Sequence, residues 1–353
     1  MLTQTLLRPR LMSALAAGPR LAAAAAYSTA TATGDLAPRK VLITGSLGQL
    51  GAVLASCFRG HFGAENVITS DIRRPAAGGG EVALAAANDG PFVFLDVRDR
   101  ASVEKVVVEN KVDTIIHLSA LLSAIGEREP QRALDVNING LHNILEIARV
   151  HNASVFCPST IGAFGPSTPV DQTPDLTIMR PTTIYGISKV HMELLGEYYA
   201  NRYGVDFRSV RYPGIISADE PGGGTTDYAI DIFHHALKTG TYNCFLHENT
   251  RLPMMYIDDC IEGTFKFITA PREKLTQSTY NMGAIDFTPA ELTSSMQRHM
   301  PNLSVSYSPD FRQKIADSWP NSLDDSSARK DWGWDPKFDL DSMVDVMFKN
   351  LKK

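Results

Sequence analysis

A short apolar segment that leads into a glycine-rich turn is the feature that most restricts how this chain can fold. Residues 40–44 read as a buried strand and residues 48–59 as a helix, and the turn between them carries Gly45, Gly48 and Gly51. Gly45 allows a tight turn, Gly48 lets a ligand approach the backbone, and Gly51 lets the helix pack closely on the sheet. This unit predicts a dinucleotide site with the phosphates at the helix N-terminus. The alternative is a structural glycine turn with no ligand.

Strands and helices alternate along the chain after this turn. The further predicted strands are residues 66–70, 92–95, 112–118, 154–157 and 206–211. The further predicted helices are residues 100–110, 131–150 and 185–203. Such alternation predicts an α/β fold with a doubly wound parallel sheet of the Rossmann type. Residues 76–90 are small, rich in glycine and without a period, and we interpret them as a variable loop.

The pattern changes after Pro213, where loops rich in Gly, Pro and Asp separate short elements. This predicts a smaller C-terminal substrate-binding lobe. We therefore divide the chain into a targeting segment, a cofactor-binding domain with the catalytic residues, and a mainly substrate-binding lobe from which some elements return to the main domain. Their limits are residues 1–34, 35–212 and 213–353.

Composition excludes several other classes of protein. The chain has 353 residues, 44% of them hydrophobic, and a formal net charge of -5. This charge gives no general field for nucleic acid, so we expect no nucleic-acid partner. No apolar run approaches the roughly 20 residues of a membrane-spanning helix, so we expect no integral membrane association. The four cysteines are scattered and the histidines show no ligand spacing, so we expect neither a disulfide framework nor a metal site.

The first 34 residues differ in composition from the rest of the chain. They contain no Asp or Glu, and they carry Arg8, Arg10 and Arg20 among Leu, Ala, Ser and Thr. A helix that is basic on one side and apolar on the other is typical of a mitochondrial presequence. We predict cleavage near residues 27–33 and a location in the mitochondrial matrix. A secretory signal, whose apolar core would be interrupted by residues 18–20, and a disordered Ala-rich tail are the alternatives.

The end of the second predicted strand indicates which dinucleotide binds. Asp71 follows Gly51 by twenty residues, where a carboxylate can accept both ribose hydroxyls and repel a 2′-phosphate. This favours NAD over NADP. Arg73 and Arg74 follow directly, and either could accept such a phosphate, so NADP remains the alternative.

A tyrosine and a lysine near the start of a predicted helix form the candidate proton-transfer set. Tyr185 and Lys189 are four residues apart and so lie on one helical face. A cation beside a phenol favours the phenolate, and Lys189 can supply that charge and reach a nicotinamide ribose. Ser159 and Thr160 follow the strand at 154–157, at the edge where such sheets bind ligands. A hydroxyl there can hold the substrate oxygen, and Ser159 can instead be a turn or cap residue.

These residues together resemble the extended short-chain dehydrogenases/reductases. The resemblance covers about residues 40–345 and rests on the glycine turn, residues 117–120, 136–140, 159–160, 185–189 and 256–259. Within that family, residues 119–123, 158–165, 211–217, 222–228, 251–256 and 317–320 are similar to the mitochondrial branch that oxidises L-threonine. Relatives acting on nucleotide sugars usually carry Ser at the position of Thr160, which preserves the hydroxyl.

The resemblance implies a role for each matching position. Tyr185 is the general base, Lys189 assists it, and Thr160 binds the substrate hydroxyl. The residues implied to bind the NAD cofactor are Gly45, Ser46, Leu47, Gly48, Gln49, Leu50, Gly51, Asp71, Ile72, Arg73, Asp96, Val97, Leu118, Ser119, Ala120, Asn137, Tyr185, Lys189 and Ile215. The residues implied to contact or close over the substrate are Ser123, Thr160, Arg180, Thr225, Thr226 and Trp319.

The implied activity is oxidation of the L-threonine β-hydroxyl by NAD to 2-amino-3-oxobutanoate, the first step of threonine degradation to glycine. A homodimer built on helices 131–150 and 185–203, and functional coupling to a glycine-forming ligase, are implied as well. We expect residues 222–224 to be the hinge of a lid. A nucleotide-sugar epimerase or dehydratase and a non-catalytic NAD-sensing subunit are the alternatives.

Overall fold

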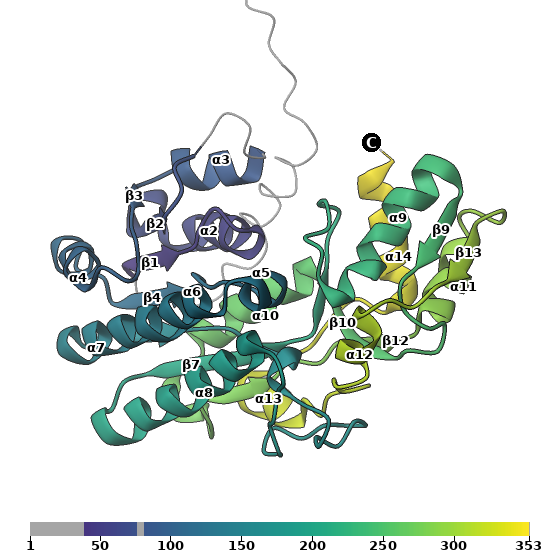
Figure 1. Cartoon of the computed structure of the whole chain (residues 1–353). Coiled ribbons are helices and arrows are strands. Elements are labelled where there is room, and N and C mark those ends of the chain that lie inside the picture. The colour runs from purple at the N-terminus through teal and green to yellow at the C-terminus, as the bar shows by residue number, and fades with distance from the viewer. Residues whose placement is uncertain (1–38, 76–80, 353) are drawn as a thin grey trace, which may run out of the picture.

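The computed structural model describes residues 39–75 and 81–352. Within these ranges a large α/β lobe lies beside a smaller lobe (Figure 1). The large lobe contains an eight-stranded sheet in the order β11-β7-β5-β4-β1-β2-β3, with β6 paired to β7, and all of its pairings are parallel. Its strands are β1 (Val41–Thr44), β2 (Val67–Asp71), β3 (Phe92–Phe94), β4 (Thr114–His117), β5 (Ser154–Phe156), β6 (Ser159–Thr160), β7 (Phe207–Tyr212) and β11 (Thr279–Asn281). The predicted doubly wound parallel sheet is confirmed.

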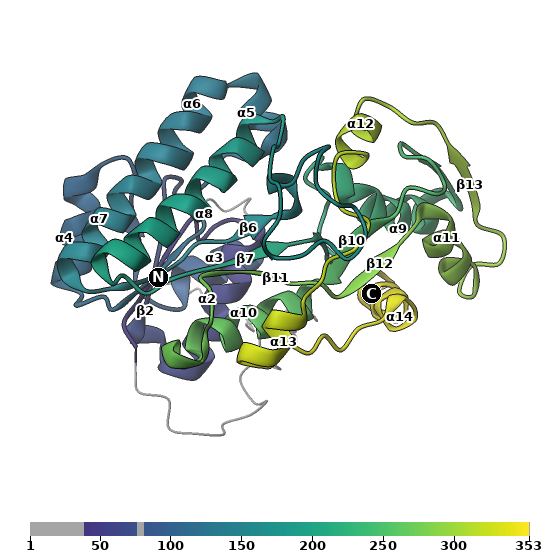
Figure 2. The ribbon, with the colours of Figure 1, turned by 90° about the horizontal axis from the view of Figure 1, so that it is seen from below.

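Helices cover both faces of this sheet (Figure 2). One face carries α4 (Arg100–Glu109), α7 (Leu141–His151) and α8 (Ile184–Tyr203), and the other carries α2 (Gln49–Phe62), α3 (Glu81–Asn88) and α10 (Ile257–Thr269). The central strand β1 is therefore buried along its whole length. Leu42 belongs to the core under α4, α7 and α8, whereas Val41 and Ile43 belong to the core under α2 and α10. This explains the uninterrupted apolar run at residues 41–43, because a strand covered on both faces has no polar side.

The prediction of a loop at residues 76–90 is wrong for its second half. Residues 81–88 form α3, whose Ala, Leu and Glu residues are good helix formers. Ala86 and Ala87 are buried, and the Arg59 guanidinium of α2 donates to the carbonyl oxygens of Ala85 and Ala86. Packing on α2 thus stabilises a helix whose small residues give it little amphipathic period. Residues 76–80 lie outside the described residues.

The predicted helix at 131–150 is present but not regular. It consists of α6 (Pro130–Leu134), a π-helical segment η2 (Asp135–Gly140) and α7. Pro130 occupies the first turn, where its missing N–H costs no hydrogen bond. The short helix α5 (Ser123–Arg128) precedes α6 and packs on α8. The π-helical segment contains Asn137, one of the predicted cofactor residues.

The smaller lobe is built from residues after β7. It contains a three-stranded sheet β12-β10-β8 and a parallel pair β13-β9. The strands are β8 (Gly214–Ile216), β9 (Thr241–Cys244), β10 (Leu252–Tyr256), β12 (Ile285–Phe287) and β13 (Ser304–Tyr307). The helices after β8 other than α10 are η4 (Thr225–Asp227), α9 (Tyr228–Thr239), η5 (Arg272–Lys274), α11 (Pro289–Gln297), α12 (Arg312–Ala316), α13 (Ser326–Trp332) and α14 (Leu340–Leu351). One buried apolar cluster extends from α2 of the large lobe to α9 and α14 of the smaller one.

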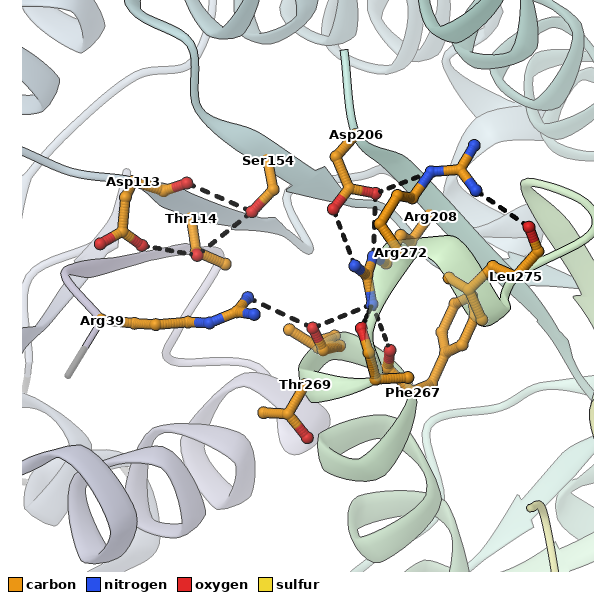
Figure 3. Close-up of polar contacts among 12 residues, drawn as sticks. Arg39, Asp113, Thr114, Ser154, Asp206, Arg208, Phe267, Thr269, Arg272 and Leu275 are labelled. Carbon is orange, nitrogen blue, oxygen red and sulfur yellow. Dashed lines mark hydrogen bonds and ion pairs between the residues drawn. The ribbon is translucent and has the colours of Figure 1, made fainter. Parts of the chain in front are cut away.

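A group of charged residues joins α10 to the amino edge of the main sheet (Figure 3). Arg208 of β7 is buried and donates to the carbonyl oxygens of Phe267, Ile268 and Ala270 at the end of α10, at 2.7, 3.1 and 2.7 Å. Its guanidinium also pairs with Asp206 at 2.8 Å. Helix C-terminal carbonyls have no partner within the helix and attract cations, so Arg208 stabilises the return of α10 to the large lobe.

Candidate active site

The turn between β1 and α2 has the backbone shape that a bound pyrophosphate requires. Gly45 has φ of 71°, in the left-handed region, and a Cβ on it would lie 2.9 Å from the carbonyl carbon of Leu118. A Cβ on Gly51 would lie 2.5 Å from the Gly45 oxygen, so the helix packs directly on the turn. Gly48 begins α2 without a side-chain cap, which leaves the helix N-terminus open to an anion. This cradle fits NAD.

The Asp71 carboxylate is fixed beside this turn. It is buried at the end of β2 and accepts from the backbone N–H of Leu47 at 3.1 Å and of Arg73 at 2.9 Å. The Arg73 guanidinium donates to the same carboxylate at 3.2 Å, and Arg74 lies over the Phe94 ring at 5.6 Å. The two arginines that could receive a 2′-phosphate are thus engaged in other contacts. This geometry favours NAD, as the sequence predicts.

The remaining residues of the glycine turn lie where α2 meets the smaller lobe. Gln49 Nε2 donates to Ser217 Oγ at 2.7 Å, just after β8, which contains Ile215. Leu50 packs against the core, and the buried Ser46 hydroxyl has no hydrogen-bond partner among the described residues. The neighbouring Ile72, by contrast, is half exposed. These residues surround the turn from both lobes.

Two of the residues predicted to bind the cofactor, Asp96 and Val97, follow β3. Asp96 pairs with Arg98 at 2.6 Å, and the hydrogen bond from this guanidinium lowers the pKa of the Asp96 carboxyl. Arg98 also pairs with Asp135 of η2 at 3.0 Å. Val97 is buried, and a Cβ on Gly140 would lie 2.9 Å from its Cγ2. The 96–98 segment is therefore held against η2.

The predicted cofactor residues Leu118, Ser119 and Ala120 follow β4 and are partly buried. Asn137 holds the end of this segment, because its side chain accepts from the backbone N–H of Leu121 at 2.8 Å and donates to the Leu121 oxygen at 3.0 Å. Its amide also donates to Ser188 Oγ of α8 at 3.1 Å. Asn137 thus fixes the 118–121 segment to the helix that carries Tyr185.

Tyr185 and Lys189 occupy the first two turns of α8. The Lys189 Nζ lies 5.6 Å from the centroid of the Tyr185 ring and donates to the Pro158 oxygen at 2.7 Å. Lys189 is buried, so its charge is poorly screened. No described residue forms a hydrogen bond with the Tyr185 hydroxyl. A phenol beside a buried ammonium, with its oxygen free, is suited to accept a proton.

Thr160 ends β6, a strand that contacts the helix carrying this pair. It caps the short helix η3 (Ile161–Ala163), and its Oγ1 accepts from the Gly162 N–H at 3.1 Å. The hydroxyl proton has no acceptor among the described residues and can be donated to a substrate oxygen. Ser159, in contrast, is buried and donates to the Glu193 carboxylate. Of the two hydroxyl groups, only that of Thr160 therefore has a proton that is not already donated to a described residue.

His117 lies under the site without taking part in it. It is buried at the end of β4, and its Nδ1 is 2.9 Å from Thr44 Oγ1. Burial, with the positive charge of Lys189 as the smaller cause, lowers the pKa of His117 to about 3. The imidazole is therefore neutral at physiological pH and does not compete with Tyr185 as a base.

The predicted substrate residues come from both lobes. Trp319 is partly buried, and a Cβ on Gly162 would lie 3.8 Å from its Cζ2, which places the indole over the segment after Thr160. Thr225 is buried in η4, and Thr226 packs on Gly214 of β8. Ser123 begins α5 and is partly buried, whereas Arg180 is exposed. Trp319 therefore lies beside the segment that follows Thr160.

A cavity of about 500 Å³ in the smaller lobe borders Trp319. Two polar residues of its lining are already paired. Arg251 binds Asp286 at 2.8 Å and Glu291 at 2.6 Å. The buried Gln313 accepts from His247 N–H and donates to the Asp317 carboxylate. The arginine of this lining is therefore already neutralised by two carboxylates and is not available to hold a diphosphate.

The sequence analysis did not identify Glu193 and Arg211, which form a buried ion pair at 2.8 Å next to Ser159. Glu193 continues the series Tyr185, Lys189 along one helical face, and this spacing could have indicated it. No helix in residues 39–75 and 81–352 is long and apolar enough to cross a membrane. The same residues contain no cluster of His, Cys, Asp and Glu that could hold a metal ion.

Comparison with known proteins agrees with this geometry. Residues 41–283 match the NAD dependent epimerase/dehydratase family. The chain is 54% identical over 323 residues to the mitochondrial L-threonine 3-dehydrogenase of Bos taurus, which covers 91% of this chain and 84% of the relative. A crystal structure of L-threonine dehydrogenase from Phytophthora infestans has a TM-score of 0.84 and 54% identity and covers 89% and 99% of the two chains. A monomeric L-threonine 3-dehydrogenase from a metagenome has a TM-score of 0.81, 41% identity and coverages of 88% and 98%.

Proposed function

Since this chain belongs to the NAD-dependent epimerase/dehydratase family, we propose that it oxidises the β-hydroxyl of L-threonine with NAD, giving 2-amino-3-oxobutanoate and NADH. One observation carries this proposal. The Tyr185 phenol has no hydrogen-bond partner among the described residues, the Lys189 ammonium is buried close to its ring, and the Thr160 hydroxyl has a proton to donate. These groups accompany a glycine turn that fits NAD. Two relatives that are 54% identical to this chain are named for this activity.

The chain's own residues account for the proton half of the reaction. Thr160 donates a hydrogen bond to the substrate oxygen and holds it near Tyr185. The Tyr185 phenolate takes the proton of the β-hydroxyl, and the Lys189 charge stabilises that phenolate. NAD, when bound, supplies the nicotinamide ring that accepts the hydride from the β-carbon. We assign the cofactor to the glycine turn, Asp71 and the 118–120 segment, and the substrate side to Thr160 and Trp319, with Ser123, Arg180, Thr225 and Thr226 around it.

Activity on a nucleotide sugar is the principal alternative. It would need cations that grip a diphosphate in the smaller lobe. Arg251, the arginine that lines the cavity beside Trp319, is already paired with two carboxylates. A small zwitterionic amino acid needs no such grip, which favours L-threonine.

We further propose a homodimer formed through α7 and α8. Large apolar side chains are exposed on these helices, namely Val150, Ile187, Leu194, Tyr198 and Tyr203. Burial of such a patch against a second copy would remove it from water. Sedimentation should give twice the chain mass for the wild type and the single mass for Leu194→Lys. A wild type with the mass of a single chain would refute the dimer; one relative is named as monomeric.

We place the protein in the mitochondrial matrix, with residues 1–34 as a cleaved presequence. These residues lie outside the described ones, and their basic, acid-free composition together with the mitochondrial relative supports the assignment. The proposed product is a β-keto acid, which loses carbon dioxide readily. A coupled ligase that forms glycine would consume this product before it loses carbon dioxide.

An absorbance assay for NADH formation tests the proposal. The chain without residues 1–34 is mixed with NAD and, separately, with each threonine stereoisomer, serine and nucleotide sugars. We expect NADH with L-threonine. No NADH with L-threonine, together with conversion of a sugar nucleotide to an epimer or dehydrated product detected by chromatography, would establish the alternative.

A further inference from the structure

We propose that the buried ion pair between Glu193 and Arg211 is a positioning device that sets the Thr160 hydroxyl relative to Tyr185 and Lys189. Neither residue touches the reacting groups directly. The inference rests on the proposed function, because it assigns the pair a role in the same proton transfer.

The argument starts from one face of α8. Tyr185, Lys189 and Glu193 follow each other at intervals of four residues and so lie along one side of the helix. Lys189 Nζ holds the Pro158 oxygen at 2.7 Å, and the Glu193 carboxylate accepts from Ser159 Oγ. Two successive turns of α8 thus hold the two residues that precede Thr160. Any change in this grip moves the Thr160 hydroxyl relative to the phenol on the same helix.

Arg211 makes it feasible to bury a carboxylate there. Glu193 and Arg211 have side chains that are 7% and 5% exposed, and an unpaired charge at such a depth is strongly unfavourable. Arg211 Nε lies 3.0 Å from Glu193 Oε1 and its Nη2 lies 2.8 Å from Oε2, a two-point contact that fixes orientation as well as charge. Arg211 is also the strand partner of Ser159 in the pairing of β6 with β7.

The same guanidinium reaches the segments that lead to the substrate side. Its Nη1 donates to the Asp175 oxygen at 2.8 Å and to Asn281 Oδ1 at 3.0 Å. The Asn281 amide in turn donates to the oxygens of Thr173 and Asp324. Asp324 follows Trp319 by five residues. One buried polar centre therefore joins α8, Thr160 and the chain that carries the indole.

A second buried arginine on the same strand offers a matched control. Arg208 is also buried on β7, pairs with the carboxylate of Asp206 and donates to backbone oxygens. Its partners lie at the amino edge of the sheet, and none of them belongs to the proposed site (Figure 3). Arg208→Lys and Arg211→Lys therefore each remove a buried guanidinium with its several N–H donors and keep the positive charge.

Turnover of the wild type with L-threonine is measured first, because its absence would refute the proposed function and this inference with it. We expect Arg211→Lys to lower kcat about 100-fold, since small misplacement of reacting groups has effects of that order, and to change the NAD dissociation constant less than about twofold. Arg208→Lys should lose comparable thermal stability and keep kcat within about twofold per folded molecule.

Ser159→Ala tests the same contact if Arg211→Lys does not fold. It leaves the ion pair intact and removes only the hydroxyl that connects the pair to Thr160. We expect kcat to fall about tenfold while NAD affinity and the KM for L-threonine stay within about twofold. An active wild type with unchanged kcat in Ser159→Ala would overturn the inference. Equal losses in kcat and NAD affinity would also overturn it, since they indicate a merely structural role.

Discussion

The amino and carboxyl edges of the main sheet use polar residues for different purposes. At the amino edge, Arg208 binds Asp206 and three carbonyl oxygens of α10, and Arg39 donates to one of the same oxygens (Figure 3). At the carboxyl edge, the Tyr185 hydroxyl has no hydrogen-bond partner among the described residues, and the Thr160 hydroxyl accepts from the Gly162 N–H but donates its own proton to none of them. A saturated network stabilises the fold, whereas unsatisfied groups on a rigid frame are available to a ligand.

The Glu193–Arg211 pair combines the two situations. Its Arg211 is as buried as Arg208 at the amino edge and is likewise paired with a carboxylate, yet the pair lies next to the Ser159–Thr160 strand. The difference between Arg208 and Arg211 is therefore one of location and not of chemistry. Three residues along one strand separate a contact that anchors a helix from a contact that orients a reacting group.

The largest effect is expected at the free phenol. Tyr185→Phe should lower kcat by about 10³-fold, because it removes the general base, while NAD affinity is retained. Stopped-flow or steady-state NADH formation and a cofactor titration measure the two quantities. If turnover persists, Tyr185 is not the base. A non-catalytic NAD-sensing subunit would bind NAD equally well with or without this hydroxyl and show no turnover in either form.

A change at the amino edge should affect stability alone. Arg208→Met removes the buried cation shared by Asp206 and the end of α10, and leaves them only the more distant contacts of Arg272 and Arg39. This should cost about 3 kcal/mol of unfolding free energy. Denaturant unfolding measures this loss, and kcat per folded molecule should be unchanged. A large fall in kcat would show that the two edges are coupled, contrary to our comparison.

The third effect concerns the glycine turn. Gly51→Ala would place a Cβ 2.5 Å from the Gly45 oxygen, and a backbone neighbour cannot move aside as a flexible side chain can. We expect NAD to bind about 30-fold more weakly, roughly 2 kcal/mol, as measured by calorimetry. Gly222→Ala is the control, because its Cβ would meet nothing closer than 3.8 Å. Equal affinities of the two variants would argue against a cofactor at this turn.

The smallest effect, taken per pH unit, is the pH dependence of stability contributed by His117. The pKa of His117 is about 3 in the folded chain, whereas that of an unfolded histidine is near 6.5. Between these two pH values the unfolded chain binds a proton at this histidine and the folded chain does not, so lowering the pH favours unfolding. Stability should fall by up to about 1.4 kcal/mol for each pH unit between about 6.5 and 3. Denaturant unfolding at several pH values should show a shallower slope for His117→Asn, whereas Arg208→Met should keep the wild-type slope.

Much of the site was predictable because it depends on local spacing. Gly45, Gly48 and Gly51 follow a strand directly, and Tyr185 and Lys189 are one helical turn apart, so each pattern lies within a few residues of sequence. The helix at 81–88 was missed, because a run of alanines has little period and is stabilised by Arg59 from another helix. The hydrogen bonds of the Asn137 amide with Leu121 and Ser188, in contrast, depend on two other segments of the chain and follow no local pattern; its cofactor contact stays a prediction.

The sequence by itself determined the parallel α/β sheet, the glycine turn and the residues that can move a proton, because period and short spacing specify them. Only the tertiary structure decided that Ser159 is engaged while Thr160 is free, and that Glu193 meets Arg211, which is 18 residues away on a strand. Such contacts depend on how a helix is placed over a sheet. That placement follows from packing of the whole core and not from any local pattern.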